Sequence, residues 1–515
     1  MSPPDANQLA ELLSVVRKKG VKLWSTEGQL RFRAPHGALS REDLELLKGS
    51  KREIVDLLGR EPHAPSVPLS GLRGRCERLP LALSQLWRWH LFRLWERPSA
   101  RVLSCAMRLS GQLNTQILQQ SVNAIVRRHD ALRTRIVVSD GVPVQEVAEF
   151  WHTDLELIDL TEPRGHATED EITLNLERYL LEPVNLESDS LLGVRLLKTQ
   201  TKEHVLIVAM EHMISDAFSL CVFVRELLTS YSQLSHGRPV ELPDVGIQFS
   251  DYSRWLEHCR QSWVDRHAEF WSKRLKEGEH RFPADVQSMQ IVTEGWAVAP
   301  LHIEADLKQR VQDWAHARRT TLAMAMLTAY AGLVLRWCDK PQVAIQYQTS
   351  GRSDEKLENA IGYFASLVCL RIELSSGTFT DLLSHVVSEY CQASERGDLS
   401  FVATETSRGL FSRNTIFNWV PCEPMTDGFD LEQSEFGLSS IPIEYTNSII
   451  KTFAWDNDPE IVLYDRPSEL RGGVYFPSER FRMSDMQCFA RSYKMILESM
   501  TSHTEVRMRD IRLRQ

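Results

Sequence analysis

Residues His204–Met210 (HVLIVAM) form an apolar run that passes through Glu211–Asp216 into a helical pattern from Ala217 to about Leu234. The run predicts a buried strand. Asp216 stands where the helix would begin, and an acidic side chain there can cap free backbone N–H groups. This strand-to-helix corner requires a fold that mixes helix and sheet, and it holds polar side chains between two rigid elements.

His212 lies in this corner, four residues before Asp216. A histidine titrates near neutral pH and is the usual general base of enzymes. The same spacing would also be found if His212 were an ordinary hydrogen-bonded histidine beside a helix cap. The choice between these interpretations therefore depends on the rest of the chain.

Residues 211–219 resemble the HHxxxDG motif of nonribosomal peptide synthetase condensation domains. His212, Asp216 and Ser219 match, whereas Glu211 replaces the first His and Ala217 replaces the Gly. Further segments resemble that family in the expected order: Pro80–Trp87, Arg127–Thr134, Phe249–Trp255, Ile361–Leu367 with Leu370 and Arg371, and Ser412–Phe417. Six segments in sequence over about residues 77–515 identify the chain as a member of this family.

The resemblance implies an α/β (α+β) fold of two chloramphenicol-acetyltransferase-like lobes, arranged as a V-shaped pseudo-dimer with the histidine loop at their junction. The lobes are expected at 77–245 and 246–515. Residues 61–76 are rich in proline and predict a linker. Residues 1–60 then form a separate module.

That module is basic, with 11 Lys and Arg against 8 Asp and Glu, whereas the remainder of the chain carries a net charge of −12. Apolar and basic residues alternate in the segments before and after Thr26-Glu27-Gly28, and this pattern predicts a β-hairpin. The stretch resembles the N-terminal β-hairpin docking domain of tubulysin-type assembly lines. The resemblance implies that an acidic C-terminal tail of a partner subunit adds beside the hairpin. The expected contacts are Lys22, Trp24, Arg31 and Arg33.

Condensation domains join an acyl thioester, carried on the phosphopantetheine arm of a carrier protein, to an amine or hydroxyl. The resemblance implies that His212 is a base for the nucleophile or positions it, with no cofactor of the enzyme's own. The backbone N–H of Ala217 is expected to face the oxyanion. Asp216 is expected to be structural and to pair with Arg352 of the other lobe.

Four further residues are candidates for substrate contacts: Glu211, Ser219, Ser366 and Asn418. A carboxylate at Glu211 would raise the pKa of His212 if it faced the ring. The alternative, which we favour slightly, is that Glu211 points into the protein as a hydrogen-bonded replacement. For Asn418, a local turn hydrogen bond is an equally good explanation.

Composition excludes several other classes. A net charge of −9 disfavours nonspecific nucleic-acid binding. The chain has no run of about 18 apolar residues and no signal-peptide pattern, which predicts a cytoplasmic protein without a membrane partner. Nine dispersed Cys predict reduced thiols and neither a disulfide framework nor a metal site. A monomer is expected because the family's pseudo-dimer is internal.

The favoured function is a free-standing condensation enzyme that forms an amide or an ester, with chain release as one role. No segment resembles an adenylation or carrier domain, so carrier proteins would supply the reactants. Two alternatives remain open: a heterocyclisation domain, since Glu211 and Asp216 have its acidic spacing, and a noncatalytic recruitment platform. Transfer from soluble coenzyme A is more remote. The sequence does not identify the acyl group, the acceptor or the carrier that docks.

Overall fold

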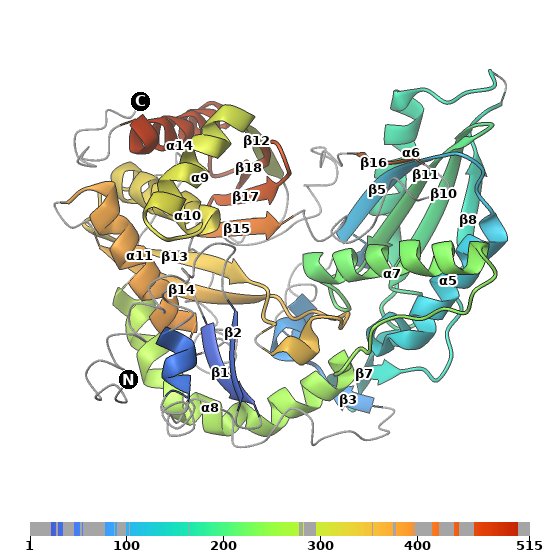
Figure 1. Cartoon of the computed structure of the whole chain (residues 1–515), viewed down its shortest axis with the longest axis horizontal. Helices are drawn as coiled ribbons and strands as arrows, with labels where there is room; N and C mark the ends of the chain where they lie inside the picture. Colours follow the sequence, from blue (N-terminus) through green and yellow to red (C-terminus); the bar gives the residue numbers. More distant parts are fainter. Residues whose placement is uncertain are drawn as a thin grey trace.

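The computed structural model describes residues 22–26, 29–33, 46–51, 54, 78–86, 88–89, 99–101, 103–162, 164–277, 282, 295–352, 354–373, 377–394, 396, 415–421, 437–441 and 458–502. The predicted linker at 61–76 and the segment Ser412–Asn414 lie outside these residues, as does most of the N-terminal module. The described chain forms two α/β lobes that lie side by side (Figure 1), which confirms the predicted fold class.

The first lobe is built on a five-stranded sheet that is covered by helices on both faces. Its strands, in spatial order, are β16 (Gly437–Ile441), β5 (Leu103–Ser110), β11 (Glu203–Met210), β10 (Leu192–Gln200) and β8 (Leu155–Asp159). Helices α5 (Thr115–Arg128) and α7 (Ala217–Ser235) pack on one face, and α6 (Glu169–Leu181) packs on the other. Two covered faces explain why β11 is apolar at nearly every position.

Smaller elements complete the first lobe. A three-stranded sheet has the order β3 (Arg78–Pro80), β7 (Val142–Val147), β6 (Thr134–Ser139). The short strands β4 (Ser99–Ala100) and β9 (Pro183–Val184) pair with each other, and the 3₁₀ turn η2 (Asp130–Arg133) follows α5. The edge strand β16 comes from the second half of the sequence and pairs antiparallel with β5.

The second lobe has a six-stranded sheet, in the order β12 (Trp296–Ile303), β18 (Leu470–Pro477), β17 (Glu460–Asp465), β15 (Thr415–Pro421), β13 (Gln342–Thr349) and β14 (Ser366–Glu373). Strands β13, β15 and β17 are parallel to one another. The main core of the lobe lies between this sheet and α9 (Ala305–Ala317), α10 (Leu322–Trp337), α11 (Phe379–Ser394) and α14 (Met483–Ser502). The 3₁₀ turn η3 (Glu355–Leu357) follows β13.

The long helix α8 (Phe249–Glu277) runs beneath both lobes in the view of Figure 1. In the N-terminal module, β1 (Lys22–Thr26) and β2 (Gln29–Arg33) form the predicted antiparallel hairpin. No helix in the described ranges is long and apolar enough to cross a membrane. The seven described cysteines are free thiols, and five of them are buried.

Candidate functional site

The corner between β11 and α7 is built as the sequence predicts. Asp216 is the N-cap of α7, in an extended backbone conformation (φ −135°, ψ 177°), and its Oδ1 accepts a hydrogen bond of 2.8 Å from the Ser219 N–H. One free donor of the first turn is thereby satisfied. The backbone N–H of Ala217 lies at the first helical position, where no intrahelical acceptor exists.

Asp216 also joins the two lobes. Its Oδ2 accepts hydrogen bonds from Arg352 Nη1 at 2.8 Å and from the backbone N–H groups of Phe364 and Ala365 at 3.0 and 3.1 Å. The side chains of Asp216 and Arg352 are only 3% and 1% exposed. The structure therefore contains the pair expected from the sequence, fully withdrawn from water.

Ser219 belongs to the same contact between the lobes. Its Oγ lies 2.8 Å from Asp216 Oδ1 and from the Gly362 carbonyl oxygen, and it accepts from Arg352 Nη2 at 3.0 Å. The residue is completely buried. Ser219 was a candidate for substrate contact, but its hydroxyl is occupied within the protein.

Gly351 allows the chain to turn from β13 into this contact. Its φ of +65° is in the left-handed region, and a Cβ there would collide with the Phe364 carbonyl oxygen. We expect Gly351→Ala to lower the free energy of unfolding by more than the about 1–3 kcal/mol of backbone strain alone. Gly141→Ala is the matched control, because Gly141 has φ +80° with open space around it. If thermal denaturation gives the same loss of unfolding free energy for both variants, the collision with Phe364 contributes nothing to the effect.

His212 is oriented by a hydrogen bond of its own. Its Nδ1 lies 2.9 Å from the Ser215 carbonyl oxygen, and its ring centroid lies 5.1 Å from that of Tyr363. Because a carbonyl only accepts, Nδ1 carries the proton in this contact. Nε2 of the neutral ring then has a lone pair, which can accept a proton from a nucleophile.

Glu211 points away from solvent and pairs with Arg88, which precedes it by 123 residues. Its Oε1 accepts from Arg88 Nε at 3.0 Å and from Nη2 at 2.8 Å, and its Oε2 accepts from the Met213 N–H. Gln85 Nε2 donates to the Met213 carbonyl at 2.7 Å. Glu211 was also a candidate for substrate contact, yet it is fully buried and serves to anchor the backbone beside His212.

The protein lowers the pKa of His212 to about 4. Burial of the ring is the main cause, and the positive charge of Arg88 acts in the same direction. The carboxylates of Glu211 and Asp216 and the Ser215 carbonyl oppose this shift without overcoming it. A carboxylate adjacent in sequence therefore does not make His212 cationic, and the ring stays neutral at physiological pH.

We expect Arg88→Met to shift the acid limb of the pH–rate profile upward by about one pH unit. The variant removes the positive charge that lowers the pKa of His212, so this pKa rises and the ring becomes cationic at a higher pH. The measurement is kcat/KM against pH. The double variant Arg88→Met/Glu211→Gln removes both the positive and the negative charge beside His212. The acid limb of its pH–rate profile should therefore return toward that of the wild type. An unmoved limb in the single variant would contradict this electrostatic role.

The remaining predicted residues lie in the second lobe and in the N-terminal module. Ser366 begins β14, where its carbonyl oxygen accepts from Thr349 Oγ1 at 3.4 Å. Asn418 is on β15, and its Nδ2 donates to Glu460 Oε1 at 3.4 Å. In the hairpin, the register pairs Lys22 with Arg33 and Trp24 with Arg31. The four predicted docking positions therefore share one face of the hairpin.

Sequence reasoning missed Arg88 and Gln85, as well as Ser84, whose Oγ donates to the Tyr363 carbonyl at 2.8 Å. All three lie in or next to the Pro80–Trp87 segment, which contacts both the histidine loop and the Gly362-Tyr363 turn. A buried carboxylate at position 211 requires a positively charged partner. This requirement was the only indication in the sequence that a residue such as Arg88 belongs to the site.

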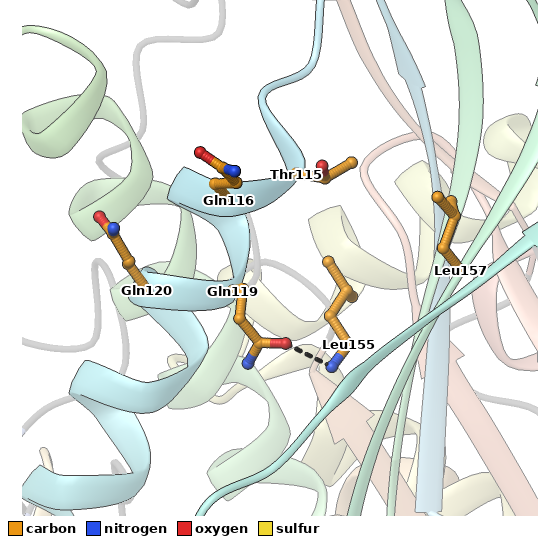
Figure 2. A pocket seen from close by; sticks show the side chains of 6 residues that line it. All are labelled: Thr115, Gln116, Gln119, Gln120, Leu155 and Leu157. Carbon is orange, nitrogen blue, oxygen red and sulfur yellow. Dashed lines mark hydrogen bonds between the residues drawn. The ribbon is translucent and has the colours of Figure 1, made fainter.

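A shallow groove of about 390 Å³ lies elsewhere, between α5 and the edge strand β8 (Figure 2). Its lining residues are Thr115, Gln116, Gln119, Gln120, Leu155 and Leu157. Gln119 Oε1 accepts from the Leu155 N–H at 2.7 Å and so ties the helix to the strand. The groove is lined by no acidic or basic side chain, and it includes none of the predicted site residues. No group of His, Cys, Asp or Glu in the described ranges is arranged to hold a metal ion.

Family comparisons agree with this geometry. Residues 77–515 match the condensation domain family, and residues 9–59 match the TubC N-terminal docking domain family. Relatives include chondramide synthase cmdD of Chondromyces crocatus, 30% identical over 346 residues, and the bassianolide nonribosomal cyclodepsipeptide synthetase of Beauveria bassiana, 27% identical over 448 residues. The matches cover 67% and 85% of this chain but only 9% and 14% of those proteins.

Solved structures share the fold. The X-domain from teicoplanin biosynthesis superposes with a TM-score of 0.71 at 23% identity, over 87% of this chain and 100% of that chain. The EpoB cyclization-docking bidomain from Sorangium cellulosum superposes with a TM-score of 0.69 at 18% identity, over 96% of this chain and 98% of that chain. At these identities the likeness concerns the fold alone.

Proposed function

This chain belongs to the condensation domain family of nonribosomal peptide synthetases, and from that premise we propose that it transfers a carrier-bound acyl thioester to an amine or hydroxyl acceptor. The observation that carries the proposal is His212, held neutral at the contact between the lobes with Nε2 available to accept a proton. We propose residues 77–245 and 246–515 as its lobes, with β16 of the second half exchanged into the sheet of the first lobe. Residues 61–76 are proposed as the linker and 1–60 as the docking module.

In the proposed reaction, the nucleophile attacks the carbonyl carbon of the thioester. A C–N or C–O bond forms, the C–S bond breaks, and the proton of the nucleophile passes through His212 Nε2 to the departing phosphopantetheine thiolate. The N–H of Ala217 faces the oxyanion. Because a thioester is already activated, orientation supplies the largest share of the acceleration, about 7–11 kcal/mol.

The structure weighs against the heterocyclisation alternative. It rests on the acidic spacing of Glu211 and Asp216, but both carboxylates are buried in ion pairs with Arg88 and Arg352, and neither is available to a substrate as an acid or base. Amide and ester formation are both consistent with the geometry. The bassianolide relative is named a cyclodepsipeptide synthetase, and a depsipeptide contains ester as well as amide bonds. Alcohols therefore belong among the acceptors to be tested.

The test is intact mass spectrometry of an acyl-loaded carrier protein incubated with the full chain and with amine or alcohol acceptors. We expect loss of the acyl group from the carrier, matched by appearance of the coupled product. The controls omit the enzyme or the acceptor. If a carrier that demonstrably docks gives no transfer to either class of acceptor, the enzymatic proposal fails and the recruitment platform is favoured.

For the N-terminal module we propose that an acidic C-terminal tail of a partner subunit adds as a strand beside the β1–β2 hairpin. Binding of a synthetic acidic peptide to the full chain should weaken about tenfold between low and high salt, because three basic contacts are screened. Lys22→Ala/Arg33→Ala should weaken binding, whereas Lys48→Ala, on the exposed side of residues 46–49, should not. Salt-independent binding would contradict the charge contribution.

A further inference from the structure

The second lobe contains a row of polar side chains, one of them buried and two partly buried, that the proposed chemistry does not use. Gln346 of β13 is paired in register with Ile416 of β15, and Ile416 is paired with Glu460 of β17. Asn418 lies two residues further along β15. Side chains alternate along a strand, so these residues share one face of three adjacent parallel strands.

This face is opposite the main hydrophobic core. Tyr347 and Phe417, the next residues along β13 and β15, stack with ring centroids 6.1 Å apart, and Phe417 lies 5.4 Å from Tyr330 of α10. Tyr347 and Phe417 therefore point toward the helices, and Gln346 and Asn418 point away from them. The row accordingly lies on the sheet face that does not pack against α10.

The polar groups of the row have unused hydrogen-bonding capacity. Gln346 is 1% exposed, and its Nε2 has no hydrogen-bond partner within the part of the chain that the structure describes. Over the same residues, the Glu460 carboxyl receives a single long hydrogen bond, from Asn418 at 3.4 Å. Burial raises the pKa of Glu460 to about 7. Buried polar groups without partners are costly and mark candidate binding sites.

The row is also placed near the reaction. β13 runs from Gln346 to Thr349 and then through Gly351 to Arg352, which contacts Asp216 at the lobe contact. Six residues of extended chain span at most about 20 Å. Ligands of parallel sheets commonly bind at the carboxyl ends of the strands, which is the direction in which β13, β15 and β17 point.

We propose that Gln346, Asn418 and Glu460 form a subsite that binds a hydroxyl group of a substrate, an inference that rests on the proposed acyl transfer. Gln346 and Glu460 flank Ile416 on strands two spacings apart, with about 10 Å between their backbones. A hydroxyl placed over Ile416, between the two side chains, would accept from Gln346 Nε2 and donate to the Glu460 carboxyl. An ammonium group cannot accept from Gln346. A carboxylate cannot donate to Glu460 and is repelled by its ionised form.

The hydroxyl can belong to the acyl donor or to the acceptor, and two pairs of probes distinguish these sources. The donor pair is 3-hydroxybutanoyl and butanoyl, each loaded on the carrier protein. The acceptor pair is the N-acetylcysteamine thioesters of serine and alanine. In wild type we expect one pair to show about a tenfold or larger preference in kcat/KM for the hydroxylated member.

Gln346→Leu should reduce this preference to near unity while changing the rate with the deoxy member less than threefold. Glu460→Gln, which keeps both hydrogen-bonding roles, should retain part of the preference. Gln342→Leu is the matched control, because it makes the same change four residues earlier on β13 and should leave the preference intact. A preference that survives in Gln346→Leu, or that is absent from both pairs in the wild type, overturns the subsite.

Calorimetric binding of the same probes separates this inference from the proposed reaction. Wild type that gives no transfer, yet binds a hydroxylated probe more tightly than its deoxy partner, would support the subsite and refute the enzymatic function, provided that Gln346→Leu loses the difference. Transfer without any hydroxyl preference in rate or affinity would support the function and refute the subsite.

Discussion

Replacing Arg352 by methionine is expected to lower the free energy of unfolding by about 3–5 kcal/mol. The substitution leaves the Asp216 carboxylate buried without its counter-charge, although the N–H groups of Ser219, Phe364 and Ala365 still bind it. It also removes a guanidinium that lies over the Phe218 and Phe364 rings, at 4.6 and 4.5 Å from their centroids. The measurement is the urea denaturation curve.

The control is Arg310→Met, because Arg310 pairs with Asp306 on the exposed surface of α9, where an ion pair contributes at most about 1 kcal/mol. The double variant Asp216→Asn/Arg352→Met should recover part of the loss, since no unpaired charge remains. A single variant as stable as the Arg310→Met control would show that the pair between the lobes contributes little to stability. Loss of activity in Arg352→Met would not by itself make either residue catalytic.

His212→Ala is expected to lower kcat by about 10²–10⁴-fold, the usual range for removal of a general base. Folding should be nearly unaffected, because the ring forms a hydrogen bond of 2.9 Å with only the Ser215 carbonyl among the described residues. Rates would be measured with saturating acyl-carrier. Circular dichroism of the variant would establish that it folds.

His236→Ala is the matched control for this change. His236 Nδ1 lies 2.7 Å from the Ser232 carbonyl oxygen, so the same kind of bond is lost at an exposed helix end. A His212→Ala enzyme with wild-type kcat would remove His212 from the mechanism and favour the recruitment platform. A raised KM with little change in kcat would instead assign His212 to binding of the nucleophile.

The corner itself could be predicted from the sequence because its determinants are local. The apolar run of β11 reflects burial on both faces, and Asp216 precedes the helix that it caps. The partner Arg352 could be named because the family resemblance placed a cation after a strand of the other lobe. The V-shaped arrangement also came from the resemblance and not from periodicity.

The electrostatics of His212 could not be predicted in this way. Glu211 would raise the pKa of His212 if it faced the ring, but its carboxylate points into the protein, which was the favoured alternative. The pKa is lowered by burial and by Arg88, which precedes Glu211 by 123 residues in the sequence. The pairing of β16 with β5 is equally invisible in local patterns, because it joins residues more than 300 positions apart. Long-range contacts of this kind depend on the assembled fold.

The exchanged strand has a consequence for how the protein can be divided. β16 covers the edge of β5, so the first lobe's sheet is complete only when the second half of the chain is folded against it. A fragment cut at residue 245 would carry β5 as an open edge, with unpaired N–H and C=O groups ready to recruit another chain. The two lobes are therefore distinct in space, but neither is made from one continuous stretch of the chain. The chain must be exchanged or engineered as one unit.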